Sequence, residues 1–497
     1  MNDFLALGPG GSVADHEGKT LEFKRDLSSP TGPLRTIVAF ANSAGGRLVI
    51  GVDDGAVAGV ADPLAEAERV ASLINDRISP QLVPAIDLVT LDGRTVLVVD
   101  VPLSTRRPHY MTRQGPEAGV YVRLGPTTRR ADPALVAELE RNARGIAFED
   151  LPEPRAALDD IDLAVLSELR GRPTDAHDLL ALGLAVAQGG EIVPTYAGIL
   201  AACPDPTRFL PSAWVQCGRL RGPSGTDIFD QIEIHGPMPL AVDKAVDFLL
   251  KHAYKTAVFG RVRRRDVYSI PVEPVREVIV NALVHAGYAE RGTPIRIGFY
   301  DDRIQVDSPG LLLPGMTIDT MRRVSRLRNP ALARVFREAG IMEQWGTGVQ
   351  RVFEQVAEAG LPEPLIEEIQ DRVRVTIYIP SHDPARPSGS ANTGGGTDAA
   401  TGSSVRVSKS SEQVALLRAL AAGELRSRAE LLTTIGLTDA YGNYRRHLLP
   451  LVEQGYLART VPDKPNSRLQ RYRITDAGRA RLAGISGAGG KGTPSAN

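Results

Sequence analysis

A long stretch of small and polar residues, 381–409, divides this chain of 497 residues. It holds few large apolar side chains and many Gly, Ser, Thr and Ala, so it cannot bury enough surface to offset the entropy lost on ordering. We therefore expect a flexible linker at 381–409, folded parts on both sides of it, and a disordered tail at 483–497. A further boundary is expected near residue 150, where a proline-containing acidic segment follows a helical pattern.

Length and composition limit the class of protein. A chain of 497 residues predicts about three domains, and 42% hydrophobic with 24% charged residues is typical of globular proteins. The formal net charge of −1 means that any basic surface must be local. Cys203 and Cys217 are the only cysteines, which excludes a disulfide framework or a cysteine-rich zinc site. Since no long uncharged apolar stretch occurs, we expect a cytoplasmic protein with no membrane partner.

Acidic residues gather near the N-terminus. Glu17, Glu22 and Lys24 lie on one expected extended segment, followed by a helix, a Gly-Gly turn and an apolar strand ending at Asp53. Carboxylates from separate elements can hold Mg²⁺ or Mn²⁺ and activate water if they meet in space. The alternative is an amphipathic edge strand with solvated charges, and the residues themselves leave both open.

The rest of this region predicts an α+β domain. β-branched segments bounded by Gly, Pro or Asp turns predict strands, and amphipathic segments predict helices. The expected strands are 47–53, 83–91, 95–101 and 119–124, and the expected helices are 34–42, 64–78 and 133–143.

Residues 13–135 resemble the Schlafen AlbA-type domain in three blocks. These are Glu-x-x-x-x-Glu-Phe-Lys at 17–24, Ala-Phe-Ala-Asn with Gly-Gly at 39–46, and Ile-Gly-Val-Asp-Asp at 50–54. In animal Schlafens with ribonuclease activity, two glutamates and an aspartate form the catalytic and metal-binding set. The resemblance implies that Glu17, Glu22 and Asp53 take those roles if this chain is a nuclease, with Lys24 close to the nucleic acid. Many bacterial relatives are treated instead as nucleic-acid-binding regulators.

A second group of polar residues lies on the predicted helix 272–288. At about 100° per residue, Glu277, Asn281 and His285 form one narrow stripe on a helix that is otherwise apolar. Buried polar groups need partners, so the stripe faces either other polar side chains or a bound ligand. Glycines at Gly346 and Gly348, which open a later helix, would let backbone N–H groups approach a phosphate.

Residues 195–380 resemble a divergent branch of the GHKL ATP-binding fold. The resemblance implies that Asn281 ligates Mg²⁺, that Glu277 is the base if the protein is an ATPase, and that Asp307 contacts adenine. The remaining residues of the implied ATP site are Gly310, Gly346, Thr347 and Gly348. Where hydrolysing relatives have Asp-x-Gly-x-Gly, this chain has Asp-Ser-Pro-Gly at 307–310, and the proline stiffens that loop. ATP binding is therefore expected, and hydrolysis is left open.

The segment 11–20 is similar to a phosphate-binding loop but fails the pattern. Gly-x-x-x-x-Gly-Lys-Thr would need glycine where Val13 stands, and no convincing strand precedes it. We expect Lys19 and Thr20 to be ordinary strand residues. A motor helicase is therefore not expected.

The C-terminal segment 410–482 predicts short helices at 412–421 and 427–435, a longer helix at 439–454, and two strands at 456–461 and 469–474. This order resembles the winged-helix fold. Arg445 and Arg446 would lie on the recognition helix and Lys464, Arg468 and Arg471 on the wing. The segment has twelve basic and seven acidic residues, a net charge of +5, which favours DNA binding. Many winged helices instead mediate protein contacts.

We therefore predict a multidomain α+β protein in five parts. They are an AlbA/Schlafen-like α+β domain at 1–150, a connecting segment and GHKL-like α/β sandwich at 151–380, the linker 381–409, a winged helix-turn-helix at 410–482 and the tail 483–497. The favoured function is a nucleic-acid-binding and ATP-binding transcriptional regulator that senses nucleotide. The alternative is a metal-dependent nuclease acting on structured RNA, in phage defence. A homo-oligomer is left open.

Overall fold

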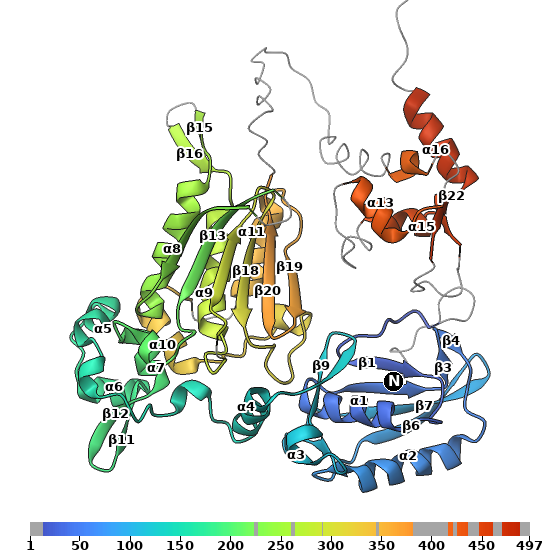
Figure 1. Cartoon of the computed structure of the whole chain (residues 1–497), viewed down its shortest axis with the longest axis horizontal. Coiled ribbons are helices and arrows are strands. Elements are labelled where there is room, and N and C mark those ends of the chain that lie inside the picture. Colours follow the sequence, from blue (N-terminus) through green and yellow to red (C-terminus); the bar gives the residue numbers. More distant parts are fainter. Residues whose placement is uncertain are drawn as a thin grey trace, which may run out of the picture. The chain divides into compact units, whose positions relative to one another are not determined.

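The computed structural model forms two compact units, residues 1–387 and 388–497, so the division falls inside the expected linker (Figure 1). Each unit is considered by itself. The structure describes residues 13–222, 227–259, 264–290, 292–343, 347–380, 416–420, 425–435, 447–460 and 470–487. The expected linker, 381–409, lies outside these residues.

The N-terminal domain is built on a four-stranded sheet of order β1-β2-β7-β6, in which β1 and β2 are parallel (Figure 1). Its elements are β1 (Leu21–Lys24), α1 (Thr31–Asn42), β2 (Gly46–Ile50), β3 (Val52–Asp53), β4 (Ala56–Val57), α2 (Pro63–Arg77), β5 (Ile78–Ser79), β6 (Ala85–Leu91), β7 (Arg94–Val101), β8 (Tyr110–Met111), α3 (Gly115–Ala118), β9 (Tyr121–Leu124), β10 (Thr127–Arg130) and α4 (Pro133–Ala143). Because strand side chains alternate, β2 and β7 supply hydrophobic residues to clusters on both faces of the sheet.

The Ala-Phe-Ala-Asn block at 39–42 has a structural role. The buried amide of Asn42 donates to the carbonyls of His109 and Tyr121, both at 2.9 Å, and accepts from the His109 N–H. Gly46 must be glycine, since its φ is +156° and a Cβ there would lie 2.7 Å from the Phe40 ring. The block therefore fixes α1 against β9 and turns the chain into β2.

The central domain has a six-stranded sheet of order β14-β13-β17-β18-β20-β19, with α8 and α9 packed against it and α11 packed against α9 (Figure 1). Its elements are β13 (Val215–Arg221), β14 (Asp227–Ile234), α8 (Met238–His252), β15 (Lys255–Phe259), β16 (Arg264–Tyr268), α9 (Val272–His285), β17 (Ile295–Phe299), β18 (Arg303–Pro309), η4 (Thr320–Arg322), α10 (Pro330–Glu338), α11 (Gly348–Glu358), β19 (Leu365–Ile369) and β20 (Arg372–Tyr378). The apolar residues of α9 are buried in the large central core, as its pattern predicts.

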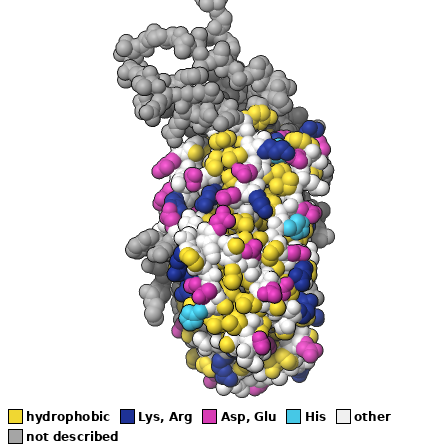
Figure 2. All heavy atoms as spheres, turned by 90° about the vertical axis from the view of Figure 1, so that its left-hand side faces the viewer, with side chains coloured by type: hydrophobic (Ala, Val, Ile, Leu, Met, Phe, Trp, Pro, Cys, Tyr) yellow, Lys and Arg dark blue, Asp and Glu magenta, His cyan; other side chains and the backbone are white. Residues whose placement is uncertain are grey.

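Charge is mixed over one broad face of the molecule. Figure 2 shows acidic and basic side chains interspersed with hydrophobic ones, and neither sign of charge dominates there.

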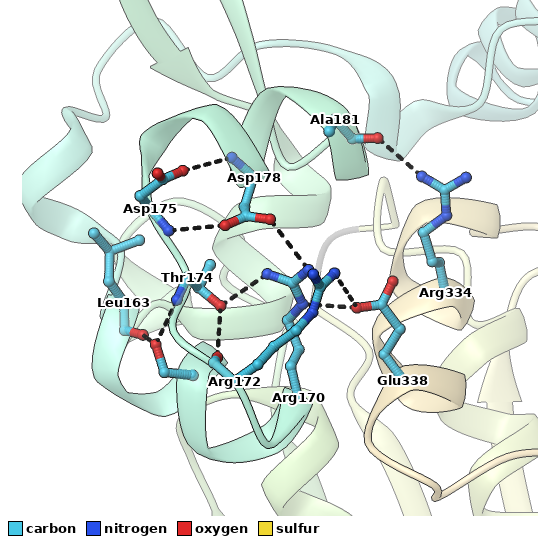
Figure 3. Close-up of polar contacts among 10 residues, drawn as sticks. Leu163, Arg170, Arg172, Thr174, Asp175, Asp178, Ala181, Arg334 and Glu338 are labelled. Carbon is cyan, nitrogen blue, oxygen red and sulfur yellow. Dashed lines mark hydrogen bonds and ion pairs between the residues drawn. The ribbon is translucent and has the colours of Figure 1, made fainter.

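A connecting segment joins the two domains. Its elements are η1 (Phe148–Asp150), η2 (Leu158–Asp160), α5 (Leu163–Arg170), α6 (Ala176–Leu182), β11 (Ala185–Gln188), β12 (Glu191–Pro194), α7 (Tyr196–Ala202) and η3 (Pro206–Arg208). The buried guanidinium of Arg170 pairs with Glu338 at 2.7 Å and Asp178 at 3.3 Å and donates to Thr174 at 2.8 Å (Figure 3). It therefore joins α5, α6 and α10.

The described part of the C-terminal unit has its own hydrophobic core. Its elements are α13 (Arg428–Thr434), α15 (Leu449–Glu453), β21 (Leu457–Arg459), β22 (Tyr472–Ile474) and α16 (Asp476–Gly487). Ser427 caps α13 and forms a capping box with Glu430, and β21 and β22 are antiparallel. Helix α16 extends to Gly487, whereas the tail was expected from residue 483.

The mixed α+β class predicted from the sequence is confirmed, and the expected strands and helices of the N-terminal domain, with the expected helix 272–288, are present within a few residues. One local expectation is wrong: β1 begins at Leu21, so Lys19 and Thr20 precede the strand. No helix among the described residues is long and apolar enough to cross a membrane.

Candidate functional site

An open cleft lies beside α9 in the central domain. Its empty volume is about 1210 Å³, including the open solvent at its mouth. Helix α9 contributes one wall, the start of α11 a second, and the segment 311–328 a third. A largely apolar cleft with a few convergent polar groups is typical of a small-molecule site.

The polar stripe of α9 faces this cleft, as its ligand-binding interpretation requires. Asn281 donates to Glu277 Oε1 at 3.2 Å, and Arg351 of α11 lies 3.4 Å from Glu277 Oε2. Arg351 also pairs with Glu343 at 2.5 Å. The amide of Asn281 donates with its nitrogen, so its oxygen is the atom that remains to accept or to ligate a cation.

Gly348 is required at the start of α11. A Cβ at this position would lie 1.9 Å from Glu277 Oε1. Gly348 and Thr347, two of the residues predicted for the ATP site, line the cleft, whereas Gly346 lies outside the described residues. The first N–H groups of α11 have no partner within the helix, which favours an anion at this end.

His285 lies at the far end of the stripe. Burial and then the nearby Arg328 guanidinium lower its pKa from 6.5 to about 4. The imidazole is therefore neutral at pH 7 and lines the cleft without adding charge.

Asp307 occupies the opposite face of β18. Val306 and Ser308 line the cleft, so alternation along the strand directs Asp307 away from it. The Asp307 carboxylate instead pairs with Arg374 at 2.6 and 2.7 Å. This placement does not support the predicted contact with adenine. Gly310, two residues after Ser308, does line the cleft.

The segment 311–328, called the cleft wall below, also belongs to the site, although none of the predicted site residues lies within it. It adds apolar side chains, with Arg326 and Arg328, to the lining. Arg326 donates to the Pro314 carbonyl at 2.6 Å, and Arg328 donates to the Leu311 carbonyl and pairs with Glu138. An irregular segment has no periodicity, so only its content of apolar residues and arginines could have indicated that it lines the cleft.

The structure does not gather the three N-terminal carboxylates. Glu22 is almost fully buried, pairs with Arg123 and Lys24 and accepts a hydrogen bond from Thr36 at 3.1 Å. Glu17 accepts from the Phe23 N–H at 3.0 Å. Asp53 pairs at the surface with Arg25 at 3.3 Å.

No group of three or more His, Cys, Asp or Glu side chains that could hold a metal occurs among the described residues. Lys24 does lie beside a carboxylate, since its Nζ is 2.6 Å from Glu22. Arg123 is the buried partner of Glu22, and no local sequence pattern indicates this pairing. Burial lowers the pKa of the Arg123 guanidinium, and the adjacent Glu22 carboxylate opposes that shift.

The predicted C-terminal contacts lie mostly outside the described residues. These are Arg445, Arg446, Lys464 and Arg468. Arg471 is described, and its guanidinium pairs with Glu430 of α13 at 3.0 Å. Side-chain exposure of 46% for Arg471 leaves it accessible to a larger partner.

Three family models match separate parts of the chain. Residues 17–132 match "Schlafen, AlbA_2", and residues 292–377 match "Putative ATP-dependent DNA helicase recG C-terminal". Residues 412–475 match "Filamentation induced by cAMP protein Fic-like, C-terminal domain". The predicted Schlafen AlbA-type domain followed by an ATPase-like domain is therefore confirmed. The two matches indicate nucleic-acid binding and ATP binding.

Two solved structures are similar to this chain. The DIP2311 protein from Corynebacterium diphtheriae is 18% identical, with 95% of this chain and 98% of that one covered and a TM-score of 0.39. The N-terminal domain of a "Putative ATP-dependent DNA Helicase RecG-related Protein" from Nitrosomonas europaea is 31% identical. That match covers 24% of this chain and 86% of the other, with a TM-score of 0.20. No protein with a curated description matches this chain.

Proposed function

We propose that this protein is a DNA-binding transcriptional regulator whose central cleft binds ATP with Mg²⁺ and thereby senses nucleotide. The observation that carries the proposal is the cleft itself, in which Glu277, Asn281 and the start of α11 converge. Asn281 would ligate Mg²⁺ through its amide oxygen, and Thr347 and Gly348 would contact phosphates. The bound metal would neutralise phosphate charge. The apolar lining would hold the base.

The contacts of Glu277 favour binding over turnover. Its carboxylate accepts from Asn281 and lies beside Arg351. Each partner lies within hydrogen-bond distance of one of the two oxygens that a general base would offer to water. Fast hydrolysis would require these partners to move. We therefore propose a sensor of bound nucleotide and not an ATP-driven machine.

The C-terminal unit would supply sequence-specific DNA contact as a winged helix. In support, α13 is followed along the chain by α15 and then by the antiparallel pair of β21 and β22. Arg471 immediately precedes β22 and is exposed enough to meet a phosphate backbone. Arg445 and Arg446 remain the predicted contacts in the major groove.

The alternative, a metal-dependent nuclease, gains no support from the N-terminal carboxylates. Glu22 already has two cationic partners, and Asp53 pairs with Arg25 at the surface. Carboxylates that neutralise arginine and lysine are poorly placed to share a divalent cation. The N-terminal domain would therefore bind nucleic acid without cutting it.

Calorimetric titration with Mg²⁺-ATP tests the central step. The wild type should bind, and Asn281→Ala should weaken binding at least tenfold while the circular dichroism spectrum stays unchanged. Gln350→Ala, a change at an exposed residue of α11 that does not line the cleft, serves as a control and should bind as the wild type does. Absence of wild-type binding would reject the sensor role.

Selection of bound fragments from a genomic DNA library tests the regulatory step. A transcriptional regulator should enrich a small set of promoter-proximal sequences, and affinity should fall steeply with salt. Incubating labelled tRNA and duplex DNA with Mg²⁺ or Mn²⁺ addresses the alternative, because specific cleavage that Asp53→Asn, a change at an exposed carboxylate, abolishes would identify a nuclease instead.

A further inference from the structure

The cleft wall, segment 311–328, lines the nucleotide cleft and also contacts the N-terminal domain. Its apolar residues line the cleft, while the Gly315 N–H donates to the Ser43 carbonyl of the N-terminal domain at 2.6 Å. Gly315 has φ +88°, and a Cβ there would lie 3.0 Å from Leu103 Cδ2. The wall therefore packs closely on two segments of the N-terminal domain, one that follows α1 and one that follows β7.

Glu368 of β19 ties this wall to the start of β1. One of its oxygens accepts from the Leu312 N–H at 2.9 Å, and both accept from Lys19 Nζ at 2.7 and 2.8 Å. The side chains of Lys19 and Glu368 are 10% and 4% exposed. Burial lowers the pKa of Lys19, and the adjacent Glu368 opposes that shift. A charge so enclosed depends on its partner, because water cannot replace it.

A second link joins the other end of the wall to α4. Arg328 lines the cleft, donates to the Leu311 carbonyl and pairs with Glu138, and both side chains of the pair are largely buried. The N-terminal domain thus contributes Lys19, Glu138 and the Ser43 carbonyl to hold one wall of the cleft.

We propose that Lys19 and Glu138 are positioning residues of the nucleotide cleft, and that nucleotide binding is coupled through them to nucleic-acid binding by the N-terminal domain. This inference rests on the proposed ATP binding. A ligand that prefers one arrangement of the wall also selects the arrangement of Lys19 and α4. Lys19 precedes β1, the strand that carries Glu22 and Lys24, so the coupled region is short. Coupling between two binding equilibria is reciprocal, so nucleic acid must alter ATP affinity by the same factor.

The test compares the full-length wild type with the double variant Lys19→Met and Glu138→Gln. The matched control is Lys244→Met and Glu140→Gln, which makes the same changes at exposed positions of α8 and α4. Titrations give the Kd for Mg²⁺-ATP, and fluorescence anisotropy gives the Kd for a labelled 30-base-pair duplex with and without saturating ATP. Lys19→Arg, which keeps the charge, is the conservative variant.

In the wild type and the control, ATP should change duplex affinity about fivefold or more, within the usual range of coupling energies. In the double variant this factor should fall to one and ATP affinity should fall at least fivefold, whereas Lys19→Arg should retain most of the coupling. Normal ATP affinity and normal coupling in the double variant would overturn the inference and leave the proposed ATP binding intact. Absence of ATP binding in the wild type would overturn both.

Hydrogen exchange on the wild type makes the test independent of whether the variants fold. Saturating ATP should slow exchange in the cleft wall and also change exchange in α4 and β1. Protection confined to the cleft, with α4 and β1 unaffected, would overturn the coupling even though nucleotide binds.

Discussion

At the scale of single residues, Glu277 organises the cleft because three neighbours depend on its carboxylate. Asn281 donates to one oxygen, Arg351 lies beside the other, and Gly348 leaves the space that the first oxygen occupies. The position of the Glu277 carboxylate therefore determines where the Asn281 amide, the Arg351 guanidinium and the start of α11 lie.

Replacing Gly348 with alanine should weaken ATP binding about tenfold, which corresponds to about 1.4 kcal/mol. The new Cβ would displace the Glu277 carboxylate and break its contacts with Asn281 and Arg351. Isothermal titration measures the effect. Gly32→Ala, where a Cβ would meet nothing within 4 Å, should bind ATP normally, and equal affinities for the two variants would contradict this account.

Replacing Glu22 with glutamine should destabilise the N-terminal domain by about 3–5 kcal/mol, because buried Arg123 would lose the carboxylate with which it pairs directly. Urea unfolding of the full chain, followed by a probe in this domain, measures the loss. Asp53→Asn removes a surface pair and should cost under about 1 kcal/mol. A harmless Glu22→Gln would show that Arg123 is solvated.

The pKa of His285 predicts a pH dependence of stability. In the folded protein this pKa is lowered to about 4 from 6.5, so the unfolded state binds a proton first as pH falls. The free energy of unfolding is therefore not reduced by His285 above about pH 6.5, and it falls progressively as pH is lowered toward 4. Melting curves between pH 4 and 8 should show a steeper loss for the wild type than for His285→Gln. Identical slopes would place the wild-type pKa near its ordinary value.

At the scale of elements, α5, α6 and α10 meet at one buried cation. Arg170 has a side chain only 1% exposed, with two carboxylates and one hydroxyl around it (Figure 3). Arg172, two residues later, approaches Glu338 only to 3.8 Å and is 60% exposed. The two arginines carry the same side chain near the same carboxylate, but only Arg170 is shielded from water.

Arg170→Met should therefore destabilise the first unit by about 3–5 kcal/mol, whereas Arg172→Met should cost under about 1 kcal/mol. The first change leaves Glu338 and Asp178 without their buried partner, and the second removes an exposed contact. Thermal unfolding of both full-length variants measures the difference. Similar melting temperatures would mean that packing, and not the ion pairs, holds these helices.

At the scale of the whole molecule, the chain consists of two compact units with separate hydrophobic cores. The nucleotide cleft lies wholly within residues 1–387. The predicted DNA contacts of the winged helix lie in residues 388–497. Nucleotide binding and sequence-specific DNA binding are therefore expected to separate when the chain is cut.

Removing residues 388–497 should leave the Kd for Mg²⁺-ATP unchanged and weaken binding to a selected promoter fragment at least tenfold. In the full chain, Arg445→Ala with Arg446→Ala should reproduce the loss of DNA binding. Titration and anisotropy measure the two affinities. A truncated protein that binds the fragment normally would assign DNA recognition to the N-terminal domain.

The sequence by itself determined the local structure. The strands β2 and β7, the helix that follows Ser427 and the polar stripe of α9 depend on residues a few positions apart, so they could be predicted. The motif order likewise indicated the AlbA-type and ATPase-like domains. Contacts between near neighbours follow from backbone geometry, which the residue pattern encodes directly.

Only the tertiary structure decided which side chains meet. Side chains alternate along β18, so Asp307 lies outside the cleft that Val306 and Ser308 line. Glu22 is buried against Arg123, and Asp53 pairs with Arg25 at the surface, so the two carboxylates do not share a metal site. Lys19 and Glu368 are 349 positions apart, so no local pattern could join them. The physical reason is that a side chain's partners are set by burial and by the register of distant strands, both of which depend on the complete fold.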